Sequence, residues 1–290
     1  MSALAVAATL TFADRLAAEV ERKRSQLCVG LDPRPELLPV ELRGDISRFC
    51  CGLVDAVAPH AVAVKPQLAF FEALGAGGIA AFEHVCRYAR RAGLLVIADG
   101  KRGDIGSTAR AYAAAYLEGA PPLADALTVN PYLGRESVEP YLAAARREGA
   151  GIFVLVKTSN AGADIQDVQL RDGHTMWQHV AQEVAEWGAE IVGDVGLSSV
   201  GAVVGATHPR EVGEARRLMP QAIMLLPGVG AQGASVAELA RAFQSGPASA
   251  LVTASRSVNY AYKETSGDYR EAAGAEAARL KLEIWAASGW

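Results

Sequence analysis

The chain has 290 residues, of which 51% are hydrophobic, 21% charged and 7% aromatic. This length and composition suit one large α/β domain or two small ones, and they argue against a disordered chain. The formal net charge of −4 argues against general attraction to nucleic acid or to an anionic membrane, so a substrate anion must meet local donors.

Cysteine and histidine usage argues against a disulfide framework and a zinc site. The cysteines are Cys28, Cys50, Cys51 and Cys86, and no pair has CxxC spacing. The five histidines form no HxH or HExxH pattern. We therefore expect reduced, mostly structural cysteines in a cytoplasmic protein without a metal site. Residues 1–10 are apolar but are soon followed by Asp14 and Arg15, so we expect neither a signal peptide nor a membrane span.

Strand-like and helix-like segments alternate along the chain. A helix is predicted over Phe12–Arg24, before the first strand. Short, mostly continuous apolar runs, typical of parallel strands covered on both faces, are Leu27–Leu31, Ala61–Val64, Leu94–Ala98, Ala126–Val129, Ile152–Val156, Val200–Ala206, Ala222–Leu226 and Ala250–Thr253. Amphipathic helical stretches lie between them at Ile46–Ala58, Ile79–Ala92, Ser107–Leu117, Val138–Arg147, Met176–Trp187, Pro209–Leu218 and Val236–Phe243. A last helix is predicted over Tyr269–Ala287.

Eight strands, each followed by a helix, predict an α/β protein with a single (β/α)8 TIM barrel domain over residues 1–290. The alternative is a doubly wound open sheet, but the first strand is followed by Gly30-Leu31-Asp32-Pro33 rather than GxGxxG. The longest interval between strands, residues 157–199, predicts an extra loop or turn around Ala161–Gly173.

The hexapeptide after the third apolar run is the most informative stretch of the chain. Residues two apart on a strand point the same way, so Asp99 and Lys101 are expected to project together, with Asp104 in the following loop. Two acids and an amine at the carboxyl end of a parallel strand predict a proton-handling site.

Polar residues follow most of the other strands, and in a barrel these ends meet at one rim. They include Asp32, Lys65, Asn130, Lys157, Thr158, Ser159, Asn160, Ser255, Arg256 and Ser257. The segment Pro227–Gly233 is rich in glycine, which lets backbone N–H groups approach an anion. Together with Gln232 and Arg256 it predicts a phosphate site.

Each charged residue also has a simpler structural interpretation. Asp104 can cap the next helix, Asp32 can cap a turn, and Lys65 can extend its amine to the rim. Asp99 and Lys101 can be a structural ion pair. A solvated amine is the favoured interpretation for Lys157. The glycines after the seventh strand can simply turn a tight loop.

These residues resemble those of orotidine 5′-phosphate decarboxylases, in particular a bacterial subgroup with slightly longer chains. The motifs that carry the resemblance are Cys28–Pro35, Lys65–Gln67, Asp99–Ile105, Val129–Tyr132, Lys157–Asn160, Pro227–Gly233 and Ala254–Ser257. They occur in the family's order over residues 12–260. The Asp-x-Lys-x-x-Asp pattern alone is shared with related sugar-phosphate decarboxylases, whereas the whole set is highly specific.

The resemblance implies a role for each matching residue. Lys65, Asp99, Lys101 and Asp104 would form an alternating charge network that converts orotidine 5′-phosphate to uridine 5′-phosphate (UMP) without a cofactor. Lys101 would give a proton to C6, and Asp99 would face the substrate carboxylate. The other implied contacts are Asp32 and Lys65 with the ribose, Ser159 with the pyrimidine, Gln232 and Arg256 with the phosphate, and Pro227 and Ser255 beside it.

The resemblance also implies a homodimer with shared sites, in which Asp104 and Thr108 enter the partner's site. Three alternatives remain open. A Mg²⁺-dependent relative, a keto-sugar-phosphate decarboxylase or hexulose-phosphate synthase, usually has an acidic ligand at the position of Lys65. A Schiff-base aldolase needs an isolated lysine of low pKa. A catalytically silent nucleotide-phosphate binding protein does not need the Asp/Lys/Asp set.

Overall fold

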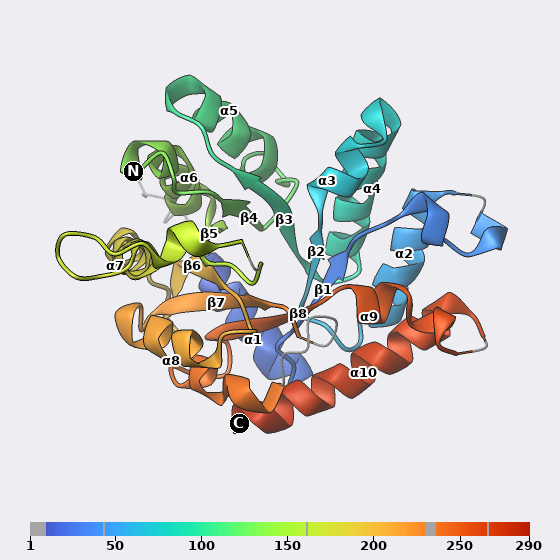
Figure 1. Ribbon diagram of the computed structural model, residues 1–290. Coiled ribbons are helices and arrows are strands. Elements are labelled where there is room, and N and C mark those ends of the chain that lie inside the picture. Colours follow the sequence, from blue (N-terminus) through green and yellow to red (C-terminus); the bar gives the residue numbers. More distant parts are fainter. Residues whose placement is uncertain (1–9, 43, 161, 230–235, 266) are drawn as a thin grey trace, which may run out of the picture.

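A closed barrel of eight parallel strands forms the centre of the computed structural model, which describes residues 10–42, 44–160, 162–229, 236–265 and 267–290 (Figure 1). Each strand pairs with its neighbours in sequence, and β8 closes the barrel against β1. The strands are β1 (Leu27–Leu31), β2 (Ala63–Pro66), β3 (Leu95–Arg102), β4 (Ala126–Val129), β5 (Gly151–Lys157), β6 (Ser198–Val204), β7 (Ala222–Pro227) and β8 (Ala250–Ala254).

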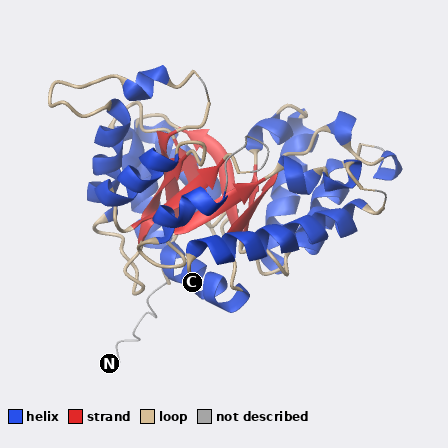
Figure 2. Cartoon of the chain, turned by 60° about the horizontal axis from the view of Figure 1, so that its bottom comes forward, coloured by secondary structure: helices blue, strands red, loops and turns tan. Residues whose placement is uncertain are grey.

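Helices surround the strands, as Figure 2 shows with helices in blue around the red barrel. The α-helices of the described residues are α1 (Phe12–Lys23), α2 (Ile46–Val57), α3 (Leu68–Glu72), α4 (Gly75–Arg91), α5 (Gly106–Leu117), α6 (Arg135–Glu148), α7 (Met176–Gly188), α8 (Pro209–Leu218), α9 (Arg256–Asn259) and α10 (Tyr269–Ser288). Short 3-10 helices are η1 (Pro35–Leu37), η2 (Val40–Leu42), η3 (Asp164–Asp167), η4 (Val236–Phe243) and η5 (Ala261–Lys263). The predicted (β/α)8 barrel is confirmed, and the open doubly wound sheet is wrong.

The continuous apolar runs mark the strands because both faces of each strand are covered. Every residue of β1, β2, β4, β6 and β8 is buried. Burial extends beyond the hydrogen-bonded segments, and this displaces two predicted boundaries. Ala61 and Val62 are buried before β2 begins, and Ala206 is buried after β6 ends.

Helix α1 closes the end of the barrel opposite the carboxyl ends of the strands. Phe12 packs its ring edge-on against Phe153 of β5 at a centroid distance of 5.8 Å. Leu16 and Val20 belong to the same buried cluster as residues of β1, β3 and β7. The helix begins after Thr11, whose hydroxyl accepts the N–H of Asp14 at 3.1 Å. With this end filled, the opposite rim is where the barrel opens to a ligand.

The predicted helix over Val236–Phe243 forms as the 3-10 helix η4, and the long interval after β5 contains η3 and α7. All four cysteines are free, and Cys28, Cys50 and Cys86 are buried. Burial raises the pKa of the Cys28 thiol to about 12. None of the helices in the described ranges combines the length and apolar character needed to cross a membrane.

Candidate active site

A cavity of about 590 Å³ opens at the carboxyl ends of the strands. This is the rim at which the fold assembles active sites, because successive parallel strands end there side by side. Eight of the site residues expected from the sequence line this cavity: Asp32, Lys65, Asp99, Lys101, Ser159, Pro227, Ser255 and Arg256.

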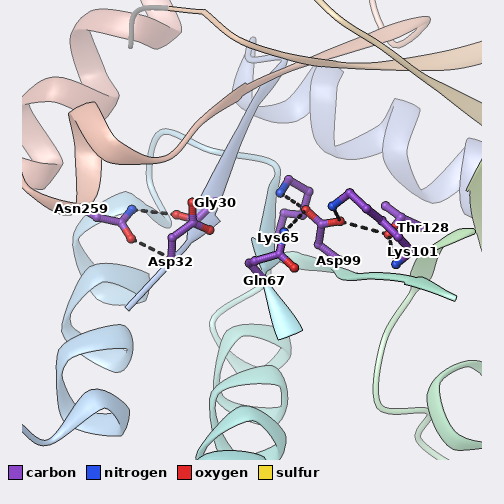
Figure 3. Close-up of polar contacts among 8 residues, drawn as sticks. All are labelled: Gly30, Asp32, Lys65, Gln67, Asp99, Lys101, Thr128 and Asn259. Carbon is purple, nitrogen blue, oxygen red and sulfur yellow. Dashed lines mark hydrogen bonds and ion pairs between the residues drawn. The ribbon is translucent and has the colours of Figure 1, made fainter. Parts of the chain in front are cut away.

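The carboxylate of Asp99 lies at the centre of a set of four donors (Figure 3). Lys65 Nζ forms an ion pair with Oδ2, to which Gln67 Nε2 also donates at 3.2 Å. Lys101 Nζ lies 2.6 Å from Oδ1, and the Thr128 hydroxyl donates to the same oxygen at 3.0 Å. Asp99 therefore has a lysine on each of its two oxygens.

The two lysines determine the charge state of this group. Burial alone would raise the pKa of Asp99, but the positive charges of Lys65 and Lys101 and their hydrogen bonds outweigh it and lower the pKa to about 2. Burial would lower the pKa of Lys65, but the negative charges of Asp99 and Asp32 outweigh it and raise the pKa. Near neutral pH, Asp99 is therefore an anion and Lys65 a cation.

The two lysines differ in their access to solvent. The Lys65 side chain is only 9% exposed, whereas that of Lys101 is 44% exposed. Lys65 is therefore enclosed by the strand ends, and Lys101 presents its ammonium group to the open part of the cavity. Of the two, Lys101 is the better placed to exchange a proton with a bound ligand.

The backbone of Lys101 is unusual. Its φ of 45° places a lysine in the left-handed region, which costs on the order of 1–3 kcal/mol. The pairing of β3 with β4 shifts register between Ala98 and Arg102, which marks a bulge at this point. Asp99 and Lys101 reach the same cavity as predicted, but an irregular strand brings them there rather than simple alternation.

Two side chains hold this irregular segment. The Thr128 hydroxyl accepts the N–H of Lys101 at 2.9 Å while donating to Asp99, so one residue positions both. Arg102 pairs with Glu72, and its guanidinium lies 5.3 Å from the centre of the Tyr112 ring. These contacts attach the residue after Lys101 to α3 and α5.

Asp32 is positioned by the segment that follows β8. Its N–H donates to Asn259 Oδ1 at 3.0 Å, and its C=O accepts from the Tyr260 hydroxyl at 2.8 Å. The Asn259 amide also donates to the C=O of Gly30 at 2.7 Å (Figure 3). Burial raises the pKa of Asp32, and the nearby Lys65 partly opposes this effect. Asp32 thus lines the cavity with its backbone N–H and C=O both hydrogen-bonded to the segment after β8.

The expected phosphate end of the cavity is described in part. Pro227, Gly228 and Val229 line it from the end of β7, and Gly228 has a φ of 111°, which favours glycine. Ser255, directly after β8, and Arg256, the first residue of α9, also line it. The remaining residues of the expected phosphate loop, Gly230, Ala231, Gln232 and Gly233, lie outside the described residues.

Several expectations for the rim need correction. Asn130 does not line this cavity. Its side chain instead accepts the N–H of Tyr132 at 3.0 Å, because the chain turns there. Lys157 is not solvated. Its side chain is 4% exposed and its Nζ lies 2.5 Å from Asp167 Oδ1, because the chain after β5 folds back over the strand end.

Asp104 and Thr108 do not line the cavity of their own chain. Asp104 is half-buried, and its carboxylate accepts the N–H of Ile105 at 2.8 Å. Thr108 is exposed on the first turn of α5.

Within the ranges that the structure describes, no group of three or more His, Cys, Asp or Glu residues is arranged to hold a metal ion.

Sequence reasoning gave no role to Gln67, Thr128, Gln166, Asn259 or Tyr260. Gln67 and Thr128 had a usable signal. Gln67 lies two residues after Lys65, and Thr128 lies two residues before Asn130. Residues two apart on a strand point the same way, so both could have been expected at the rim. The positions of Gln166, Asn259 and Tyr260 depend on how loops return to the strands, and a local pattern does not predict this.

Comparisons with known proteins indicate the family of this chain. A family model described as "Orotidine 5'-phosphate decarboxylase / HUMPS family" matches residues 25–266. An orotidine 5′-phosphate decarboxylase of Rhodopirellula baltica is 48% identical over 272 residues, covering 88% of this chain and 90% of that protein. One of Deinococcus radiodurans is 50% identical over 266 residues, covering 91% of this chain and 95% of that protein.

Solved structures give the same result. The structure of Leishmania donovani OMP decarboxylase matches with a TM-score of 0.78 at 31% identity, covering 97% of this chain and all (100%) of that chain. The family model and the relatives each cover most of the sequence. The chain therefore belongs to the orotidine 5′-phosphate decarboxylase / HUMPS family.

Proposed function

We propose that this protein decarboxylates orotidine 5′-phosphate to UMP, the last step of de novo UMP biosynthesis, without a cofactor. The observation that carries the proposal is the Asp99 carboxylate held between buried Lys65 and accessible Lys101 at the barrel rim. The family and the two relatives named above support the same reaction.

The reaction needs a cation where negative charge develops. Loss of CO₂ from C6 leaves a carbanion in the ring plane, and no carbonyl group is placed to delocalise it. A preorganised ammonium group at that point stabilises the transition state electrostatically and can then supply the proton. Lys101 has this role in our proposal, because it is the more accessible lysine and Asp99 holds it beside the cavity.

Asp99 can act in two ways, by repelling the substrate carboxylate or by holding the two lysines. Facing the substrate carboxylate, a lone Asp99 would repel it by about 4 kcal/mol at 4 Å and an effective dielectric of about 20. In this site, however, a lysine contacts each oxygen of Asp99, and the trio carries a net charge of +1 from two cations and one anion. We infer that repulsion is a minor contribution and that Asp99 chiefly holds Lys65 charged and both lysines in position.

Larger contributions must come from elsewhere, since a barrier reduction of about 20 kcal/mol exceeds any single contact. Binding energy from the distant phosphate, used to order the surrounding loops, is one source. We assign phosphate contacts to Gln232 and Arg256, with Pro227 and Ser255 beside them.

The ribose and the pyrimidine occupy the rest of the cavity in this proposal. Asp32 and Lys65 bind the ribose hydroxyls, and Ser159 contacts the pyrimidine. All three side chains line the cavity from different strand ends. The set would fix a nucleotide at both its base and its sugar.

We further propose a homodimer in which Asp104 and Thr108 complete the partner's site. They point to this role because both lie outside the cavity of their own chain, Asp104 in the loop after β3 and Thr108 on the first turn of α5. We place the protein in the cytoplasm, where free thiols such as its four cysteines stay reduced.

The ultraviolet absorbance of orotidine 5′-phosphate tests the proposal directly. Purified protein should lower the absorbance of orotidine 5′-phosphate as it forms UMP. Prior treatment with EDTA should leave the rate unchanged. No decrease in absorbance would refute the proposal. A rate lost with EDTA and restored by Mg²⁺ would instead favour the metal-dependent members of the family.

A further inference from the structure

The segment 162–175, between β5 and α7, forms an attachment to the barrel rim. It is the yellow-green loop with a short helical turn, η3, in Figure 1. Gln166 N–H donates to Ala163 O at 2.9 Å within η3, and Leu170 N–H donates to His174 O at 2.8 Å across a small hairpin. The Met176 N–H, at the start of α7, donates to Val168 O at 2.9 Å. Hydrogen bonds therefore join the segment 162–175 to itself and to the first residue of α7.

The side chain of Gln166 returns from this segment to the end of β5. Its Oε1 accepts the backbone N–H of Thr158 at 2.9 Å, and its Nε2 donates to the Thr158 hydroxyl at 2.8 Å. That hydroxyl donates in turn to Asn160 Oδ1 at 2.7 Å. One carboxamide thus satisfies both the backbone and the side chain of a single rim residue.

The neighbouring pair makes a second attachment. Lys157 Nζ lies 2.5 Å from Asp167 Oδ1, so residues 157 and 158 are bound by residues 167 and 166. The amine is buried at 4% exposure, whereas the Asp167 side chain is 59% exposed, so solvent weakens this pair. The Gln166 contacts are the more specific of the two, because two directional hydrogen bonds fix an orientation.

Ser159 follows immediately and lines the cavity, as do Thr158 and Gln166. On its other side lies Gly205, where an added Cβ would come within 3.0 Å of Ser159 N, Cα and Cβ. The Gly205 N–H also donates to Lys157 O at 2.7 Å. Ser159 is thereby confined between β6 and a segment whose preceding residue is held by Gln166.

We propose that Gln166 is a positioning residue that holds Ser159 toward the base of the bound nucleotide and so determines how tightly the base is bound. This inference rests on the proposed function, in which Ser159 contacts the pyrimidine. Because Gln166 itself lines the cavity, the alternative is that it touches the ligand directly, and the experiment must separate the two.

A double-mutant cycle separates them. Gln166→Ala and Ser159→Ala should each lower kcat/KM for orotidine 5′-phosphate about tenfold, as expected for loss of one ordered hydrogen bond. If Gln166 acts through Ser159, the double variant should lose little more than either single variant. Independent losses, about a hundredfold in the double variant, would overturn the proposal.

Binding measurements supply a readout that does not depend on catalysis. Gln166→Ala should weaken UMP binding about tenfold and leave the binding of ribose 5-phosphate, which has no base, unchanged. Equal weakening of both ligands would mean a general distortion and would overturn the proposal. The matched control is Gln221→Ala, whose amide makes one exposed contact with Gly196 O at 3.3 Å and should behave as wild type.

Two further measurements keep the test decisive. Hydrogen exchange at the Thr158 amide should accelerate in Gln166→Ala, and unchanged exchange would overturn the attachment itself. If Gln166→Ala does not fold, Thr158→Val keeps the backbone contact with Gln166 and removes the hydroxyl with its contacts to Gln166 and Asn160. It should give the same selective loss of UMP binding on a smaller scale. A wild-type protein that does not turn over orotidine 5′-phosphate would refute the proposed function, whereas additive losses in an active protein would refute only this inference.

Discussion

Replacing Lys65 and Lys101 separately by methionine distinguishes the buried lysine that holds Asp99 from the lysine that we propose as the proton donor. Both lysines bind the same carboxylate, Asp99, but the Lys65 side chain is 9% exposed and that of Lys101 is 44% exposed. A solvent-screened ion pair contributes under about 1 kcal/mol to stability. Breaking a buried pair costs about 3–5 kcal/mol, because the remaining charge stays buried without its partner.

Lys101→Met should therefore lower the free energy of unfolding by less than about 1 kcal/mol, since Asp99 keeps Lys65, Gln67 and Thr128. Lys65→Met should lower it by about 3 kcal/mol, the lower end of the range, because Lys101 still neutralises Asp99 in part. Turnover should fall at least about a thousandfold in Lys101→Met, as for loss of an essential general acid.

The assay combines urea unfolding at pH 7 with turnover of orotidine 5′-phosphate by the same preparations. Lys65→Met, which removes the more buried lysine, should lose more stability than Lys101→Met. The Lys101 variant should remain folded while losing activity. Equal destabilisation by both substitutions, together with retained turnover in Lys101→Met, would contradict the reasoning. The cluster would then be an ordinary ion-pair network.

Three further predictions follow from the site. The folded-state pKa of Asp99 is about 2, below its unfolded value of 3.8, so its charge stabilises the fold above about pH 4. About 2 kcal/mol of stability should disappear as the pH falls from 4 to 2, and melting curves of Asp99→Asn should lack this component. Mixing inactive Asp104→Ala and Lys101→Ala subunits should restore part of the activity if sites are shared, and no recovery after proven subunit exchange would argue against sharing. Arg102→Lys should lower kcat about tenfold, because an ammonium group cannot both pair with Glu72 and stack on Tyr112; unchanged kcat would mean that the bulge positions Lys101 unaided.

The barrel could be predicted because buried parallel strands appear as continuous apolar runs, and the site because such strands end at one rim. Asp32, Lys65, Asp99 and Lys101 line one cavity because β1, β2 and β3 end at that rim. Strand alternation did not predict the left-handed backbone of Lys101, since that conformation depends on a register shift against β4.

Loop paths account for the expectations that failed. Lys157 is expected to be solvated when only its neighbours in sequence are considered, but Asp167 returns from ten residues later to pair with it. The same return brings Gln166 to Thr158. Contacts of this kind depend on the course of an irregular segment, for which neither a period of 2 nor one of 3.6 residues provides a signal.

The most direct test of the central claim compares wild-type protein and Lys101→Ala, both treated with EDTA, in the orotidylate absorbance assay. We expect the wild-type protein to convert orotidine 5′-phosphate to UMP. Lys101→Ala should show no measurable conversion while still binding UMP. Conversion by Lys101→Ala at a rate near that of the wild-type protein would contradict the assignment of Lys101 as the proton donor.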